Sequence, residues 1–279
     1  VFKNINSNSE NSENFKENEN VELLSSILFD GNIPLKKETQ KYNNLLTPKF
    51  SLRYSPNSTK NNSNLNKKIN YDSIFSIDRV DNSAVEGGES ITLGIDYSSS
   101  NKNNEVIIKS SLANIIRLNE NEDLPQIHGL SEKRSDLIGK FEIIPSKFFD
   151  LSYEYSIDKD LNHSNYDLIK TNLSLNNFVT SFEFLEEDNK LNQNSYLANS
   201  SKYNFNNNYS IKFETSKNLD KNITDYYNLI YEYENDCLTA AIEYNKNYYT
   251  DGTMKPEENF LFSIKIIPFG KINSPSIAK

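Results

Sequence analysis

The stretch FDLSYEYSI, residues 149–157, decides the fold class of this 279-residue chain. Its odd-numbered positions carry Phe, Leu, Tyr or Ile, and its even-numbered positions carry Asp, Ser or Glu. A period of two is typical of a β-strand with one apolar and one polar face. The same alternation recurs along the chain, in stretches that begin at Phe50, Ile91, Tyr209, Tyr227 and Phe260.

The spacing of these stretches indicates long strands. Between residues 21 and 269 we count roughly 13 of them, and their starts repeat about every 20 residues. A soluble sandwich repeats about every 8–12 residues, whereas a membrane-spanning strand of about 9–11 residues needs a longer repeat once its turns are added. The spacing therefore predicts an all-β fold and favours part of an outer-membrane β-barrel, while a sandwich stays open as an alternative.

The composition excludes several classes of protein. The chain has 39 acidic and 30 basic residues, and its net charge of −9 argues against a nucleic-acid partner. Mean hydropathy is −0.70, and no run approaches the roughly 20 apolar residues that a membrane helix needs. The 17 Tyr and 16 Phe residues are more than a disordered polar chain would carry, so we expect a folded protein.

The two ends of the chain differ in character. Residues 1–20 are nearly all Asn, Ser, Glu and Lys, which offer too little apolar surface to offset the entropy of ordering. We expect a disordered or loop segment over residues 1–20 and the barrel portion over residues 21–279. The chain begins at Val1, no apolar signal segment follows, and Cys237 is its one cysteine, which together predict the C-terminal piece of a longer protein.

Three stretches carry a resemblance to a known family. LTPKFSLRYSPN (residues 46–57) has a P-x-x-x-x-x-Y-x-P pattern, and DSIFSIDRVDNSAVEGGESITLGIDY (residues 72–97) has F-S-x-x-R and an acidic-Gly stretch before a T-L-G strand. YEYENDCLTAAIEYNKNYYTDGTMKPEENFLFSIKI (residues 231–266) has a cysteine-bearing segment and ends in an aromatic-rich strand. In this order the stretches resemble the C-terminal barrel region of the LPS-assembly protein LptD family, also called organic solvent tolerance protein.

The resemblance implies a fold and a function. The fold would be the C-terminal portion of a large antiparallel outer-membrane β-barrel, with about 13 strands in this chain. The function would be that of a lipopolysaccharide translocon component in the cell outer membrane. The implied partners are lipopolysaccharide, an LptE-like plug lipoprotein inside the barrel, outer-membrane lipid, and a periplasmic LPS-transport bridge reached through an N-terminal domain outside this sequence.

The resemblance also implies roles for particular residues. Lipopolysaccharide would leave sideways between the first and last strands, so residues 260–269 would form the closing strand and one side of this lateral gate. Proline has no N–H to donate to a β-ladder, so Pro268 either interrupts the pairing there or simply ends the strand. The residues implied for the gate are Phe260, Phe262, Ile264, Ile266 and Pro268.

Cys237 has an implied role of its own. Members of the family carry one or two cysteines at the position of Asp236 and Cys237, and these form a disulfide with a cysteine near the N-terminus of the whole protein. The resemblance therefore implies a disulfide between Cys237 and a partner outside this chain, in the oxidising periplasm. A buried unpaired thiol is the alternative.

Catalytic and metal-binding interpretations find little support. His128 and His163 are the only imidazoles, and neither stands in a triad pattern, so we predict no enzyme, no catalytic residue and no cofactor. An acidic run could hold Ca²⁺ through its carboxylates, but a solvated loop is the simpler interpretation and we predict no metal site. That run comprises Glu183, Glu186, Glu187 and Asp188.

Basic side chains on the polar face raise a further question. Arg53, Lys109, Arg117 and Lys212 could meet phosphate groups, but charges of both signs are ordinary inside barrels and we assign no site. Two other functions stay open at this point. One is a porin-like outer-membrane diffusion channel, and the other is a secreted β-sandwich or adhesin.

Overall fold

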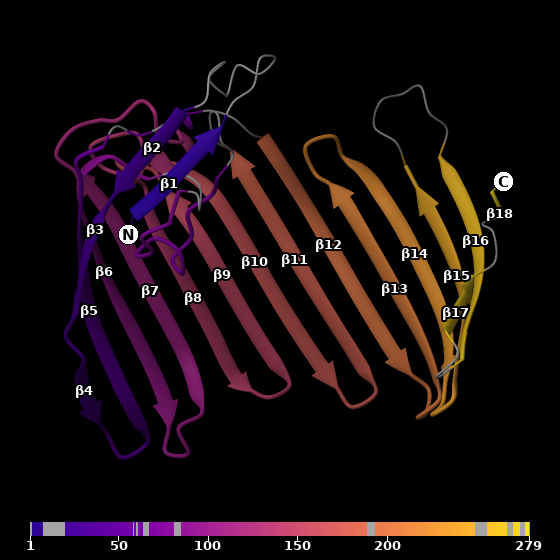
Figure 1. The fold of residues 1–279 in the computed structure, drawn as a ribbon. Helices are drawn as coiled ribbons and strands as arrows, with labels where there is room; N and C mark the ends of the chain where they lie inside the picture. The colour runs from indigo at the N-terminus through magenta and orange to yellow at the C-terminus, as the bar shows by residue number, and fades with distance from the viewer. Residues whose placement is uncertain are drawn as a thin grey trace. The chain divides into compact units, whose positions relative to one another are not determined.

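The structure, a computed structural model, is built almost wholly from antiparallel strands (Figure 1). It describes residues 2–7, 20–57, 59, 61–63, 67–80, 85–188, 193–248, 256–266, 270–273 and 277–278. The one helical element in these ranges is the single 3-10 turn η1, Ile127–Gly129. No helix within the described ranges is long and apolar enough to cross a membrane.

One large sheet contains most of the strands. Its neighbours run in the order β17-β16-β15-β14-β13-β12-β11-β10-β9-β8-β7-β6-β5-β3, while β4 also pairs with β5 and β18 also pairs with β16. Thus each strand from β5 to β16 pairs with the next strand in the chain. The bounds are β3 Ile27–Asn32, β4 Leu35–Glu38, β5 Tyr42–Ser55, β6 Gly88–Asn101, β7 Val106–Arg117, β8 Leu137–Ser146, β9 Phe149–Ile157, β10 Ser164–Leu175, β11 Phe178–Asp188, β12 Gln193–Asn204, β13 Tyr209–Asn218, β14 Ile223–Glu234, β15 Leu238–Asn247, β16 Glu257–Ile266, β17 Gly270–Asn273 and β18 Ile277–Ala278.

The predicted all-β fold is confirmed. Within the described residues, the strands on this path that precede β17 are β3 and β5–β16, which agrees with the expected count of about 13. A second, two-stranded sheet pairs β1, Phe2–Ser7, with β2, Asn20–Ser25. The division at residue 20 between a loop segment and a barrel portion stays a prediction.

The chain divides into two compact units, which we describe one at a time. Unit 1 contains residues 1–141, 154–166 and 188–192, and unit 2 contains residues 142–153, 167–187 and 193–279.

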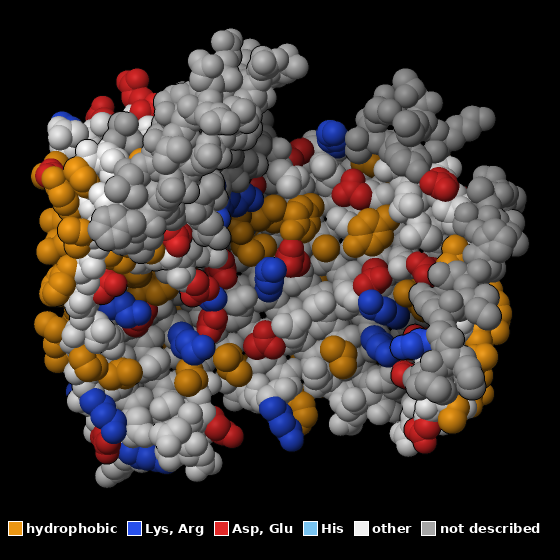
Figure 2. All heavy atoms as spheres, viewed as in Figure 1, with side chains coloured by type: hydrophobic (Ala, Val, Ile, Leu, Met, Phe, Trp, Pro, Cys, Tyr) orange, Lys and Arg blue, Asp and Glu red, His pale blue; other side chains and the backbone are white. Residues whose placement is uncertain are grey.

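In unit 1 the strands expose their apolar face and cover their polar face. Leu52 and Tyr54 of β5 are 43% and 48% exposed, whereas the alternating residues Ser51 and Arg53 are 2% and 4% exposed. On β6, likewise, Thr92 is buried and its neighbours in sequence are exposed. The left margin of Figure 2, where Figure 1 draws β3 and β5, shows this exposed hydrophobic surface. A soluble sandwich would bury the apolar face against a second sheet, so the sandwich alternative is wrong for these strands.

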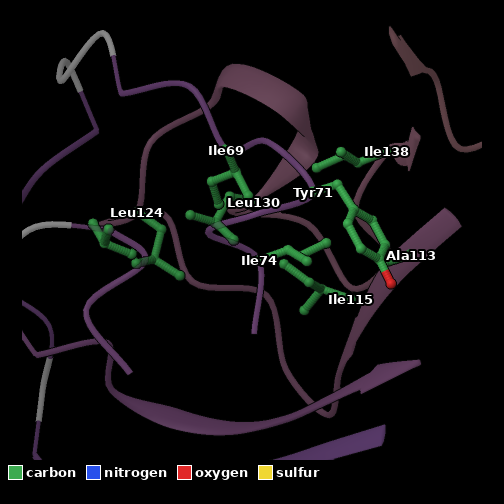
Figure 3. Close-up of a cluster of buried hydrophobic side chains, with 9 residues drawn as sticks. Ile69, Tyr71, Ile74, Ala113, Ile115, Leu124, Leu130 and Ile138 are labelled. Atoms are coloured by element: carbon green, nitrogen blue, oxygen red, sulfur yellow. The ribbon is translucent and has the colours of Figure 1, made fainter. Parts of the chain in front are cut away.

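Two connections cover the polar face of unit 1. We call the described residues 67–80, between β5 and β6, together with residues 118–136, between β7 and β8, the loop cluster. Its apolar side chains form the hydrophobic core of the unit against the inward residues of β7 and β8 (Figure 3). The members of this core are Ile69, Tyr71, Ile74, Val80, Ala113, Ile115, Leu124, Leu130 and Ile138.

Unit 2 shows the same two faces in its strands. The register pairs Phe213 with Leu229 and Tyr244 with Phe260, and Phe213, Leu229 and Phe260 are exposed. On the other face, Lys and Glu side chains form ion pairs. These pairs are Lys170–Glu183 at 2.9 Å, Lys202–Glu232 at 3.7 Å and Lys212–Glu214 at 2.6 Å. Figure 2 shows such basic and acidic side chains close together on the face in view.

Candidate functional site: a buried arginine–glutamate cluster

A tight series of turns brings the loop cluster onto the polar face of β6. Asn70 begins it, because its side-chain Oδ1 accepts the Ser73 N–H at 3.0 Å and its carbonyl accepts the Ile74 N–H at 3.0 Å. The Phe75 ring then lies directly over Gly94, where an added Cβ would stand 2.6 Å from the Phe75 Cζ atom. Glycine at residue 94 is therefore what allows the loop to lie so close to the strand.

The turn that enters β6 also depends on glycine. Gly87 donates its N–H to Thr59 Oγ1 at 2.8 Å, and a Cβ there would stand 2.3 Å from the Asn57 carbonyl oxygen. Gly88 has a φ of +83°, a conformation that side chains with a Cβ rarely adopt. This E-G-G turn carries the Glu86 carboxylate inward, beneath the loop cluster.

Arg79 and Glu86 form the centre of the site. Arg79 Nε donates to Glu86 Oε2 at 2.7 Å, and Arg79 Nη2 donates to Glu86 Oε1. Arg79 also donates to two hydroxyls of β6, from Nη1 to Thr92 Oγ1 at 2.8 Å and from Nη2 to Ser90 Oγ at 3.0 Å. This planar, bidentate arrangement is the strongest form of arginine–carboxylate pairing.

Two further arginines converge on the same carboxylate from neighbouring strands. Arg117, at the end of β7, donates from Nη2 to Glu86 Oε1 and from Nε to the Leu130 carbonyl at 2.8 Å. Arg53, on β5, has its Nε 3.9 Å from Glu86 Oε2 and donates to the carbonyls of residues 76 and 77 at 2.5 and 2.7 Å. Glu86 thus joins β5, β7 and residues 67–80, and Arg117 extends the connection to residues 118–136.

The Glu86 carboxylate is ionised in this environment. Its side chain is 1% exposed, and burial alone would raise its pKa. The positive charges of Arg79 and Arg117 and the hydrogen bond from Arg79 outweigh that effect and hold the pKa of Glu86 well below its usual range. Because a buried charge is tolerated only with close partners, the arginines and Glu86 depend on one another.

A second group of polar bonds holds the other end of the loop cluster. Asp136 Oδ2 accepts hydrogen bonds from Ser156 Oγ and Asn165 Nδ2, each at 2.8 Å. Burial raises the pKa of Asp136, and the hydrogen bonds from Asn165 and Ser156 oppose that rise. Beside it, Asn114 Nδ2 donates to the Ser135 carbonyl at 2.6 Å, which ties the loop to β7.

The two parts of the loop cluster also bond to each other. His128 Nδ1 lies 2.8 Å from the Ile69 carbonyl oxygen, and both residues are buried. In the same connection, upstream of residues 67–80, the Asn62 N–H donates to the Asp123 carbonyl at 2.7 Å. Together with the shared hydrophobic core, these bonds make the two connections one packed body.

Among the described residues, each unit has a cavity on its polar face. The cavity in unit 1 has a volume of about 280 Å³ and lies beside the loop cluster, with Asp30, Lys49, Tyr71 and Phe75 among its lining residues. The cavity in unit 2 has a volume of about 300 Å³, and Lys170, Glu183 and Glu214 are among its lining residues.

The structure places the residues of the predicted gate on β16, apart from Pro268, which lies outside the described residues. Phe262 and Ile264 pair with Ile242 and Ala240 of β15, and the other edge of β16 pairs with β17 and β18. Phe260, Phe262 and Ile266 are exposed. The role of this strand as a lateral gate stays a prediction.

Cys237 lies exposed in the turn between β14 and β15, as a free thiol in this structure. Its N–H donates to Asn235 Oδ1 at 2.9 Å, a side-chain bond that organises the turn. The alternative of a buried thiol is therefore wrong, while the predicted disulfide to a cysteine outside the chain stays a prediction.

The remaining candidate residues lie apart from one another. His128 is buried in the loop cluster, whereas His163 is exposed with its Nε2 3.4 Å from Asp188 Oδ2. In the acidic run, Glu183 pairs with Lys170 and accepts a hydrogen bond from Tyr196 Oη at 2.5 Å. Across the described ranges, no three His, Cys, Asp or Glu side chains lie close enough together to hold a metal ion.

Sequence reasoning missed the role of Arg79 and Glu86. Both belong to the F-S-x-x-R and acidic-Gly patterns on which the family resemblance rests, so the signal was present without an assigned contact. On an open polar face, Arg53 and Arg117 would be free to meet phosphate groups. The structure instead buries both beneath the loop cluster, and their guanidinium groups are used within the protein.

Comparison with known proteins gives one match that identifies a family. Residues 3–209 match the family model LptD, LPS transport system D, and these residues include the whole arginine–glutamate cluster. Comparison with curated proteins finds no match. Among solved structures, the crystal structure of Acinetobacter baumannii OccAB4 is similar with a TM-score of 0.31 and 9% identity, covering 95% of this chain and 87% of that chain. A likeness this weak carries no argument.

Proposed function

Because the chain belongs to the LptD family of lipopolysaccharide transport components, we propose that it forms the C-terminal part of an outer-membrane barrel that delivers lipopolysaccharide to the cell surface. The role is transport by structure, without a chemical step. Its localisation would be the cell outer membrane.

The observation that carries this proposal is the reversed burial of the strands. Leu52 on β5 and Leu93 on β6 are more than 40% exposed. The polar residues next to them in sequence, Ser51, Arg53 and Thr92, are buried. An apolar face that no protein covers is stable where the solvent is hydrocarbon, as on the outside of a membrane barrel. The exposed face of β5, β6 and β13–β16 would therefore contact outer-membrane lipid.

The polar face suits a passage for an amphiphilic substrate. Lipopolysaccharide has a sugar and phosphate part that needs a hydrated, hydrogen-bonding route, and an acyl part that needs lipid. In unit 2, paired charges such as Lys212–Glu214 and Lys202–Glu232 line the face opposite the lipid. The acyl chains would pass to lipid at an opening beside β16, with Phe260, Phe262, Ile264 and Ile266 on its lipid side; Pro268 follows them in the sequence.

Further partners follow from the family. An LptE-like lipoprotein would occupy part of the barrel interior, and a periplasmic transport bridge would deliver the substrate through an upstream domain. Cys237 would connect the turn between β14 and β15 to that domain by a disulfide. Its exposure in a turn supports this part of the proposal, because a partner cysteine could reach it.

A cross-linking experiment tests the transport role. A photoreactive residue replaces Ile264 on β16 or, as a matched control, Leu229 on β14, in the full-length protein in cells. Newly made, pulse-labelled lipopolysaccharide is expected to cross-link at residue 264 while it is being delivered, and much less at residue 229. Equal labelling at both positions would contradict the gate, and normal surface delivery in cells depleted of the protein would contradict the transport role.

A porin-like channel is the second candidate, and the loop cluster weighs against it. In unit 1 the loop cluster covers part of the polar face of β5–β7, where Arg53, Thr92 and Arg117 are at most 4% exposed. An open diffusion pore needs a hydrated polar surface there. Passage of small sugars into liposomes that contain the protein would favour the channel.

A further inference from the structure

We propose that β17 (Gly270–Asn273) and β18 (Ile277–Ala278) together form a capping strand, which covers the edge of β16 while the barrel wall is open beside it. The proposal rests on the proposed function, because it assumes that lipopolysaccharide leaves through an opening beside β16. It adds the element that makes such an opening stable in a membrane. When the wall closes, the first strand of the barrel displaces the capping strand and takes its place on β16.

The first argument is that both short strands lie on one edge of β16 (Figure 1). β17 pairs with residues 263–266, and β18 pairs with residues 259 and 260. The other edge of β16 is already paired with β15 along its whole length. Because an edge forms a hydrogen-bonded ladder with one neighbour at a time, the first strand of the barrel cannot pair with these residues while the capping strand does.

The second argument is the cost of an uncovered edge in a membrane. Backbone N–H and C=O groups find no water in hydrocarbon, so open sheet edges do not occur there. Phe260 and Phe262 are exposed and would contact lipid in the proposed barrel, so the edge beside them lies at membrane depth. A strand that takes this edge supplies partners to the backbone of β16 when the first strand of the barrel leaves.

The third argument is that the capping strand is held more weakly than a strand of the wall. β15 and β16 pair at ten positions in one continuous register, whereas β17 and β18 pair with only six residues of β16. The register also shifts by one residue between β17 and β18. In addition it places Lys271 opposite Lys265, and like charges directly opposite each other destabilise a pair of strands. A partner with a longer, continuous register can therefore displace the capping strand.

The first experiment measures which partner β16 has, in the full-length protein in cells. Ser263→Cys combined with Asn273→Cys allows a disulfide between β16 and β17. Directly opposite residues of antiparallel strands have Cα atoms about 4.5–5.5 Å apart, which is within the range that a disulfide bridges. The matched control, Ala241→Cys combined with Ser263→Cys, joins β15 to β16 instead. Mass spectrometry without reduction identifies the joined peptides and separates them from any bond to Cys237.

The yield of the disulfide between β16 and β17 should depend on transport. We expect it to be severalfold higher while lipopolysaccharide is being delivered than after its synthesis has been stopped, whereas the control yield should stay constant. Lys271→Glu places opposite charges across the pair and should raise the yield in both conditions. Equal yields with and without lipopolysaccharide supply would show a permanent strand of the wall and would overturn the capping strand.

The second experiment weakens the capping strand and measures delivery. Lys271→Pro combined with Ile272→Pro removes two neighbouring N–H groups, and because N–H groups alternate between the two edges of a strand, one of them is aimed at β16. We expect a heat-modifiable barrel that delivers lipopolysaccharide severalfold more slowly, since its opened edge lacks a partner. Lys271→Ala combined with Ile272→Ala keeps both N–H groups and should slow delivery much less. Wild-type delivery in the proline variant would overturn the proposal.

The two proposals fail in different ways. If the proline variant does not assemble, the disulfide yields decide, because they are measured on a barrel whose backbone N–H groups are all intact. A yield that does not change with supply, in cells where residue 264 still cross-links to lipopolysaccharide, overturns the capping strand and leaves the transport role standing. Absence of the cross-link at residue 264 contradicts the exit beside β16 itself.

Discussion

Arg79 and Glu86, seven residues apart, meet beneath the loop cluster with both carboxylate oxygens bonded to one guanidinium group. The pair lies across the entrance to β6, and its carboxylate is shared with Arg117 of the next strand. Because Arg53 of β5 also lies 3.9 Å from this carboxylate, a contact between two nearby residues connects β5, β6 and β7. Its consequences can be measured as stability and as pH dependence.

Glu86→Ala is expected to lower the free energy of unfolding by about 3–5 kcal/mol, since it leaves buried arginine charges without a partner. The measurement is guanidinium unfolding of the full-length protein in lipid vesicles. The control is Glu132→Ala, which breaks an exposed pair with Lys159 and should cost at most about 1 kcal/mol. Equal costs for the two variants would mean that the cluster is not buried in the working protein.

Gly94→Ala is expected to destabilise the protein by about 1–3 kcal/mol, as overpacking of a dense core does. The new Cβ would meet the Phe75 ring at 2.6 Å and the Leu112 carbonyl oxygen at 2.9 Å. Because the ring can be removed and the backbone cannot, Phe75→Ala should relieve part of this cost in a double-mutant cycle. Strictly additive costs would show that the ring and Gly94 are not in contact.

The strands could be predicted from the sequence, and the loop cluster could not. Alternation in residues 149–157 defines a strand with two faces, but alternation alone does not say which face is covered, so a sandwich stayed open until the exposure of Leu52 was known. Ile115 and Ile116 are both isoleucines, yet Ile115 is buried and Ile116 is 43% exposed. Two consecutive apolar residues do not alternate with polar ones, so the sequence does not indicate which of the two faces the core.

The buried charges were hidden from sequence reasoning for a different reason. Arg53, Arg79 and Arg117 lie far apart in the chain, and their convergence on Glu86 depends on how the covering loops fold. Turn chemistry around Asn70 and the glycines at residues 87–88 indicates bends, but not which strand the bends bring the side chains to. The motif could thus be recognised while its physical role remained undefined.

Acid should weaken the wild type more than Glu86→Gln. The arginines hold the pKa of Glu86 below its usual range, so the folded protein binds fewer protons there than the unfolded chain does. This stabilisation is present above the ordinary carboxyl pKa of about 4.3 and is lost as the pH falls below it toward the folded-state value. The unfolding midpoints of the wild type and Glu86→Gln should differ at neutral pH and converge at acidic pH. A difference that stays constant with pH would contradict the ionised cluster.

The two faces of β14 should respond in opposite ways to the same new charge. Leu229→Arg places a guanidinium group on the exposed apolar face and should cost about 2–4 kcal/mol if that face is near the bilayer centre. Asn228→Arg places it on the polar face, where Asn228 Nδ2 now donates to Glu214 Oε2 at 3.2 Å, and should be tolerated. Folding into lipid vesicles, followed by heat-modifiable gel migration, measures both. Equal tolerance would contradict the lipid-facing assignment.

Cys237 should carry a disulfide in the full-length protein isolated from outer membranes. Its turn is organised by Asn235, whose Oδ1 accepts the N–H groups of Cys237 and Leu238 at 2.9 and 2.8 Å, so the thiol is presented at a defined place rather than on a loose segment. Mass spectrometry without reduction is expected to find a peptide that joins residue 237 to a cysteine of an upstream domain. Cys237→Ser should then slow lipopolysaccharide delivery while leaving the barrel heat-modifiable, whereas Thr239→Ser, two residues along at the start of β15, should leave delivery unchanged. A free thiol at residue 237 in material that delivers lipopolysaccharide would show that barrel and upstream domain are coupled without this bond.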